Sequence, residues 1–255
     1  MLPTLLQRLS RLALPLAVSL SAFAVQAGEL TVSAAASLTN AFKDLKPLYE
    51  AAHPGSTVQF NFGASGALLA QISKGAPVDV FVSADPETMD QAQGRGLLEA
   101  GQRKDIASNT LVLIVPKGAA DTPKTTAELT TARYARIAIG LPASVPVGRY
   151  TQSVLQAEGR WAAIEAKMIG ANNVRQALDY VARAEVDAGF VYATDAALMP
   201  DKVRVAFTVP TPQPVRYPAA ALKAAPNPVD AQRFMAFLLK PEAQAVLAKH
   251  GFGKP

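Results

Sequence analysis

Residues 34–42, AAASLTNAF, contain a pattern that recurs along this chain. The run before them, LTVS at 30–33, is typical of a β-strand. After Ser37, apolar residues recur at helical spacing, beginning with Leu38, Ala41 and Phe42. Ser37 therefore lies at a predicted strand-to-helix corner, where backbone N–H groups and a hydroxyl can hold an anion. A serine in this position also caps its own helix, so a function for Ser37 depends on whether the corner recurs.

The same pattern recurs twice in the first hundred residues. A predicted strand at 57–62 is followed by the turn GASG at 63–66, which contains Ser65, and then by a helix. A third strand at 78–82 leads to Asp85 and Pro86, which are typical of an N-cap and a first helical residue. This β-α-β-α-β-α order predicts a parallel sheet with right-handed crossovers.

Later patterns predict a second lobe of the same kind. The apolar strand at 111–116 is interpreted as a crossing into that lobe, and residues 217–222 as the return crossing. We therefore predict a two-lobed α/β fold, in which each lobe is a mostly parallel sheet flanked by helices and two crossover strands act as hinges. Ligands in such sheets bind at the carboxyl ends of strands, so the cleft is the expected site. The predicted division is a signal peptide at 1–27, lobe 1 at 29–110 and 213–255, and lobe 2 at 111–212.

Composition excludes several classes of protein. Of the 255 residues, 50% are hydrophobic and 18% are charged, which favours a buried core over disorder. The chain has no cysteine, so thiol catalysis, cysteine metal sites and disulfides are excluded. The formal charge of +5 is not concentrated in a basic tract of the kind that binds nucleic acid.

The N-terminus has the features of an export signal. Arg8 and Arg11 precede an apolar stretch at 12–25, and small residues at Val25 and Ala27 are typical of a cleavage site. We predict cleavage after Ala27 and a periplasmic mature protein with a charge of about +3, since the signal carries two of the arginines. An uncleaved anchor is less favoured, because a span needs ~20 apolar residues.

Taken together, these motifs resemble the periplasmic molybdate-binding proteins of ABC-type importers, which are type II periplasmic binding proteins. The matching pieces cover the mature chain in order: AAASLT at 34–39, the Ser65 turn, VSAD at 82–85, VPVG at 145–148, NVR at 173–175, VYATD at 191–195 and HGF at 250–252.

The resemblance implies a ligand, a partner and a set of contacts. It implies binding of molybdate or tungstate, delivery to a membrane permease, no enzymatic activity, no cofactor and a monomeric protein. The implied contacts are hydroxyl and N–H groups of Ser37 and Ser65, the N–H groups of Val147 and Val174, and the Tyr192 hydroxyl. They touch the oxygens of the ion, so the metal atom itself has no protein ligand. Such donor-only contacts suit a tetrahedral dianion, which needs donors and no acid beside it.

Alternatives remain open from the residues themselves. Sulfate is a dianion of similar chemistry, whereas phosphate keeps a proton and needs an acceptor; Asp195 is the acid nearest in sequence to Tyr192. A serine hydrolase using Ser65 would need a nearby histidine, and His53 and His250 do not occupy suitable positions in the sequence. An iron-binding relative would need clustered tyrosines, and Tyr192 is isolated among the cleft positions. Arg149 and Arg175, in the first turns of their helices, are expected on solvated faces.

Overall fold

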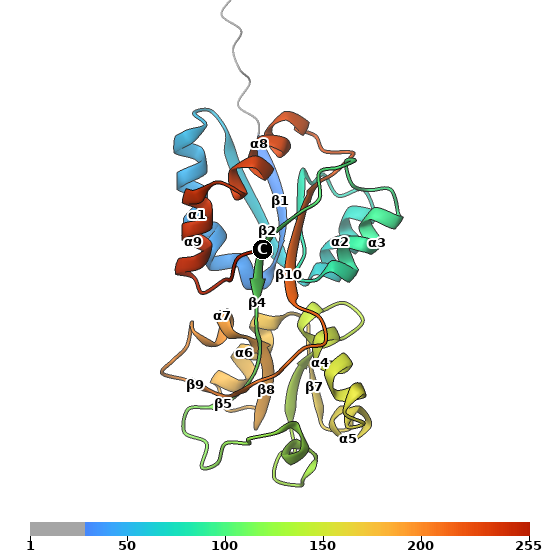
Figure 1. Ribbon diagram of the computed structural model, residues 1–255, viewed down its shortest axis with the longest axis vertical. Helices are drawn as coiled ribbons and strands as arrows, with labels where there is room; N and C mark the ends of the chain where they lie inside the picture. The colour runs from blue at the N-terminus through green and yellow to red at the C-terminus, as the bar shows by residue number, and fades with distance from the viewer. Residues whose placement is uncertain (1–28) are drawn as a thin grey trace, which may run out of the picture.

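Two lobes, each built on a five-stranded sheet, make up the computed structural model, which describes residues 29–255 (Figure 1). The strand order is β2-β1-β3-β10-β4 in the sheet of lobe 1 and β7-β6-β8-β5-β9 in the sheet of lobe 2. This confirms the predicted two-lobed α/β fold. The predicted signal segment and its cleavage after Ala27 lie outside the described residues.

Lobe 1 contains the strand-to-helix corners predicted around Ser37, Ser65 and Asp85. The Ser37 corner includes a short 3-10 helix, η1, before α1 begins at Thr39. The elements of lobe 1 are β1 (Glu29–Ala35), η1 (Ala36–Leu38), α1 (Thr39–Ala52), β2 (Thr57–Gly63), α2 (Ser65–Ser73), β3 (Val80–Val82), α3 (Pro86–Gly94), β4 (Lys104–Asn109), β10 (Val215–Ala221), α8 (Pro228–Leu238) and α9 (Pro241–Lys249).

Lobe 2 repeats the pattern of strands followed by helices. Its elements are β5 (Leu111–Pro116), η2 (Thr126–Thr130), β6 (Ile137–Gly140), α4 (Pro146–Ala157), α5 (Trp161–Glu165), β7 (Met168–Ala171), α6 (Val174–Ala182), β8 (Ala188–Tyr192), α7 (Ala193–Ala196) and β9 (Val203–Thr208).

In each sheet four of the five strands run in the same direction, which confirms the prediction of mostly parallel sheets, and one strand, β10 or β5, runs against them. In lobe 1, β1 pairs in parallel with β2 and β3, whereas β10 is antiparallel to β3 and β4. In lobe 2, β6 is parallel to β7 and β8, and β5 is antiparallel to β8 and β9. The reason is the double crossing. A strand that enters from the other lobe starts at the cleft, so β5 and β10 must run opposite to strands that end there.

The crossings lie between strands. The first passes through Thr110, between the end of β4 at Asn109 and the start of β5 at Leu111. The second lies at 209–214, between β9 and β10. Residues 217–221 belong to β10 inside lobe 1, so the predicted return crossing at 217–222 is wrong. The apolar character of that segment reflects burial within the sheet.

The C-terminal helices pack on lobe 1, which agrees with the predicted assignment of residues 213–255 to that lobe. Phe42 and Tyr49 of α1 contact Phe234 of α8 edge-on, with ring centroids 6.3 and 5.1 Å apart. Pro47 lies within α1, and a single helix continues through it. None of the helices at 29–255 combines the length and the apolar character needed to cross a membrane.

Candidate functional site

A small cavity of about 10 Å³ lies between the lobes, and all five residues implied by the resemblance line it. Lobe 1 contributes Ser37 and Ser65, while lobe 2 contributes Val147, Val174 and Tyr192. A volume of this size is about that of one water molecule, so the lobes are closed over the site. The structure thus brings together residues that are far apart in the sequence.

The two serines do not cap their helices. Neither η1 nor α1 has a side-chain cap, and Ser65 is the first residue of α2, whose N-cap position is Ala64. The Ser65 Oγ accepts a hydrogen bond of 3.0 Å from the backbone N–H of Ala84. Because that bond uses an oxygen lone pair, the Ser65 proton remains able to donate into the cavity.

In lobe 2, local chemistry leaves one N–H group at each of two helix starts. In α4, Pro146 has no N–H group, and those of Gly148 and Arg149 bond to the carbonyl of Val145. The N–H of Val147 is therefore left to face the cavity.

The start of α6 has the same arrangement through a side chain. The Oδ1 atom of Asn173 accepts hydrogen bonds from the N–H groups of Arg175, at 2.9 Å, and Gln176, at 3.1 Å. The N–H of Val174 is the first of the helix and is not one of those that Asn173 takes. Both helix starts thus direct an N–H group and the positive end of a helix dipole toward the cavity.

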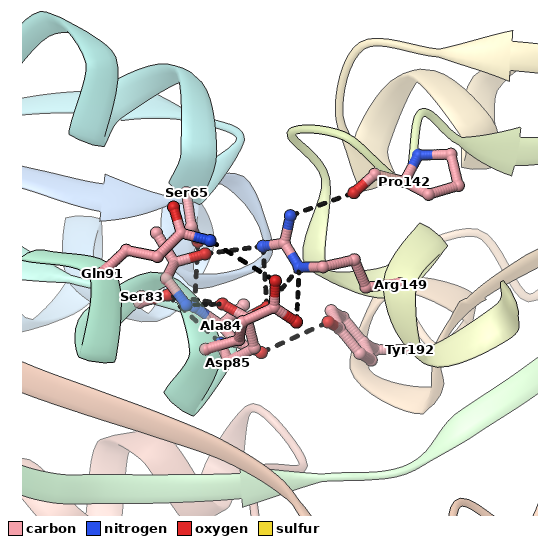
Figure 2. A network of polar contacts seen from close by, with 10 residues as sticks. Ser65, Ser83, Ala84, Asp85, Gln91, Pro142, Arg149 and Tyr192 are labelled. Atoms are coloured by element: carbon pink, nitrogen blue, oxygen red, sulfur yellow. Dashed lines mark hydrogen bonds and ion pairs between the residues drawn. The ribbon is translucent and has the colours of Figure 1, made fainter. Parts of the chain in front are cut away.

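Tyr192 ends β8, and its hydroxyl points across the cleft toward lobe 1 (Figure 2). It donates to the carbonyl of Ala84 over 3.4 Å, which is a long bond that a better acceptor can replace. Burial raises the pKa of the Tyr192 hydroxyl well above its ordinary value, so the group stays protonated and able to donate.

The lining of this cavity carries no charged side chain among the described residues. A larger cavity of about 380 Å³ is lined by three carboxylates, those of Asp85, Glu87 and Asp90, together with Arg149. Its carboxylates disfavour an anion. In the described part of the chain, no group of three or more histidine or acidic side chains is arranged to hold a metal ion.

Arg149 is not on a solvated face, which corrects the expectation from the sequence. It reaches from α4 to Asp85, and its Nε lies 2.8 Å from the Asp85 Oδ2 (Figure 2). It also donates to the Thr88 hydroxyl at 2.6 Å. Asp85 caps α3 through the N–H of Thr88, as predicted, and additionally bonds an arginine of the other lobe.

Arg175 likewise bridges the lobes. Its Nε contacts the Asp195 Oδ1 at 2.5 Å within lobe 2. Across the cleft, its guanidinium donates to the Asn40 side chain at 2.7 Å and to the carbonyl of Ser37 at 3.0 Å. The two arginines therefore hold the lobes together beside the cavity without lining it.

Asp195 is fully buried, and among the described residues its Oδ2 has no hydrogen-bond partner. Burial raises the pKa of this carboxyl to about 6, and the attraction of Arg175 only partly opposes that effect.

A backbone contact also joins the lobes. The N–H of Gly66 donates to the carbonyl of Ser144 over 3.0 Å. A Cβ atom at Gly66 would lie 2.7 Å from that carbonyl oxygen, closer than such atoms approach. The absence of a side chain at Gly66 is thus what permits the closed arrangement.

Comparison with known proteins identifies the family. Residues 30–253 match the family model described as "Bacterial extracellular solute-binding protein". The chain belongs to this family.

Named relatives of this solute-binding protein include the molybdate-binding protein ModA of Escherichia coli. The two are 34% identical over 245 residues, which cover 94% of each chain. ModA of Haemophilus influenzae is 33% identical over 88% of this chain and 89% of its own. Among solved structures, the periplasmic molybdate-binding protein of Azotobacter vinelandii aligns with a TM-score of 0.74 and 27% identity, over 89% of this chain and 99% of that one.

The family is one of solute-binding proteins and not of enzymes, which removes the serine hydrolase alternative. The geometry agrees, since both histidines are engaged away from Ser65. His53 bonds the carbonyl of Tyr49, and His250 bonds the carboxylate of Asp44, each at 2.9 Å.

Proposed function

We propose that this protein binds molybdate and tungstate, each as an intact tetrahedral oxyanion, in the cavity lined by Ser37, Ser65, Val147, Val174 and Tyr192. The observation that carries the proposal is the convergence of hydroxyl and N–H donors from both lobes on one uncharged cavity. The molybdate-binding relatives support the choice of ion.

Neutral donors are sufficient to hold such an ion. Each hydrogen bond to a charged group contributes about 1.5–3 kcal/mol. Several are needed, because the ion loses its hydration shell on entering the cleft. Two helix starts add positive partial charge without a buried lysine or arginine.

Sulfate is the alternative ligand, because the same donors would suit it. It carries two negative charges and no proton near neutral pH, and it differs from molybdate chiefly in being smaller. Binding of molybdate, tungstate, sulfate and phosphate should be compared by parallel calorimetric titrations. We expect tight 1:1 binding of the first two and far weaker binding of the others; equal affinity for sulfate would contradict the assignment to molybdate.

The proposed role is delivery to the membrane permease of an ABC importer. The mature protein would begin after Ala27, reside in the periplasm and act as a monomer of two lobes, with lobe 1 at 29–110 and 213–255 and lobe 2 at 111–212. The closed form would be presented to the permease, which would release the ion by separating the lobes. Transport in membranes that contain the permease, with and without this protein, tests the role.

A further inference from the structure

A chain of hydrogen bonds runs from the first crossing to the cavity. The Asn109 Nδ2 lies 3.2 Å from the Tyr217 hydroxyl, which lies 2.9 Å from the Ser37 Oγ. Asn109 ends β4 and Tyr217 lies near the start of β10, so each residue adjoins one crossing between the lobes. The Tyr217 side chain is fully buried, and Ser37 is 2% exposed.

The direction of these bonds follows from the backbone at Thr110. The Thr110 N–H donates to the Asn109 Oδ1 at 2.8 Å, which identifies that atom as the oxygen of the amide. The amide NH₂ group therefore faces Tyr217 and the Thr194 hydroxyl, which is 2.9 Å away. An NH₂ group only donates, so the Tyr217 oxygen accepts from it.

The Tyr217 proton then has one acceptor among the described residues, the Ser37 Oγ. Burial raises the pKa of the Tyr217 hydroxyl above its ordinary value, so the proton is retained at any physiological pH. Because Ser37 accepts this bond, its own proton points elsewhere, and the cavity that it lines is the open direction.

We propose that Tyr217 and Asn109 are positioning residues that fix the Ser37 hydroxyl as a donor, and that the cavity thereby selects oxyanions without a proton over protonated ones. This inference rests on the proposed function and deepens it. The Ala84 N–H likewise donates to the Ser65 oxygen, which leaves the Ser65 hydroxyl as a donor toward the cavity. A protonated oxyanion such as hydrogen phosphate would turn its O–H toward hydroxyls that already accept one bond and aim their own proton into the cavity, so its O–H meets a proton where it needs a lone pair. A poorly paired donor is costly in a closed site.

Tyr192 does not impose the same restriction. Its oxygen receives no protein donor among the described residues, and its proton is held only by the long bond to Ala84. The two serines therefore carry the selection, and Tyr217 controls one of them.

The test is the ratio of molybdate to phosphate affinity in the full chain and in Tyr217→Phe. Molybdate binding is measured by calorimetry, and phosphate by competition against molybdate near neutral pH. The variant keeps the aromatic ring, which packs edge-on against Phe252 at 5.4 Å and lies 6.0 Å from Tyr192. We expect molybdate affinity to fall by about tenfold and the ratio to fall as well, because the freed Ser37 hydroxyl can turn to accept.

Asn109→Asp reverses the chain. A carboxylate would accept the Tyr217 proton, so the Tyr217 oxygen would accept from Ser37 in turn. The added negative charge weakens the binding of both molybdate and phosphate, so the ratio of the two affinities is the quantity to compare. Thr194→Val is the matched control, since it removes the other acceptor of Asn109 and leaves the Tyr217–Ser37 bond. Thermal unfolding of the unliganded variants establishes that they fold.

The outcomes separate the two proposals. Absence of molybdate binding by the unaltered protein would reject the proposed function. If that protein binds molybdate, the positioning role of Tyr217 and Asn109 is supported when the ratio of molybdate to phosphate affinity falls in both Tyr217→Phe and Asn109→Asp but not in Thr194→Val. An unchanged ratio in the two variants overturns that role, and so does phosphate that still fails to compete with molybdate. An equal fall of the ratio in Thr194→Val also overturns it.

Discussion

Each residue proposed to hold the ion offers the cavity one or two hydrogen-bond donors. The Ser65 oxygen accepts a hydrogen bond from the N–H of Ala84, and the Tyr192 hydroxyl donates one to the Ala84 carbonyl. Val147 and Val174 have N–H groups that are not used at the starts of their helices. The side chains of the two valines are not needed for such contacts. Substitution of a serine should therefore matter more than substitution of a valine.

For the serines, we expect Ser37→Ala and Ser65→Ala each to weaken molybdate binding by about 1–3 kcal/mol. Each change removes a hydroxyl and retains the backbone N–H. The control is Val147→Ala, which should bind nearly as tightly as the parent. Calorimetry measures all three, and serine variants with parental affinity would show that these hydroxyls do not contact the ion.

Asp195 predicts a pH effect on stability. Its pKa is about 6 in the folded protein against an ordinary value of 3.8, so the folded state binds more protons between those values. Its contribution to the free energy of unfolding is complete below the lower value and is lost as pH rises through the upper one. Relative to Asp195→Asn, the unliganded parent should lose about 1–3 kcal/mol across this window in urea unfolding. A difference that stays flat, or that grows with pH, would contradict this.

At the scale of elements, the helix starts were predictable and the partners of their side chains were not. The corners at Ser37 and Ser65 follow from local patterns of apolar spacing and small residues. The sequence wrongly predicts that Arg149 is in solvent, because its partner Asp85 is 64 residues away and lies in the other lobe. The sequence also places Tyr217 in a crossing, whereas its hydroxyl bonds to Ser37, which is 180 residues away in the chain. Strand β4 was not predicted, since KDIASN has no clear apolar alternation.

The start of α2 also predicts a steric effect. Gly66→Ala would place a methyl group against the Ser144 carbonyl of the other lobe, so it would obstruct the closed arrangement. We expect molybdate affinity to fall at least tenfold while the unliganded thermal stability changes little, because alanine is favourable in a helix. The matched control is Gly94→Ala at the end of α3, where an added Cβ atom would have no neighbour within 4 Å. Equal affinities in the two variants would mean that this contact does not limit closure.

At the scale of the molecule, the donors are divided between lobes that are joined by two crossings, at Thr110 and at 209–214. If these donors bind the oxyanion as proposed, either lobe alone satisfies only part of it, so we expect the ion to bind the closed arrangement far better than an open one. That difference in affinity is what allows a ligand to shift a conformational population. Arg149 and Arg175 add contacts between the lobes in this closed arrangement, and we expect separation of the lobes to break them. Bending at the two crossings is the motion this requires.

Small-angle scattering of the mature protein, with and without saturating molybdate, measures whether the lobes close on binding. We predict that the radius of gyration falls on binding, because the lobes close around the ion. Gly66→Ala should show a smaller decrease. A scattering curve that stays unchanged when calorimetry shows the site to be filled would contradict closure by the ligand.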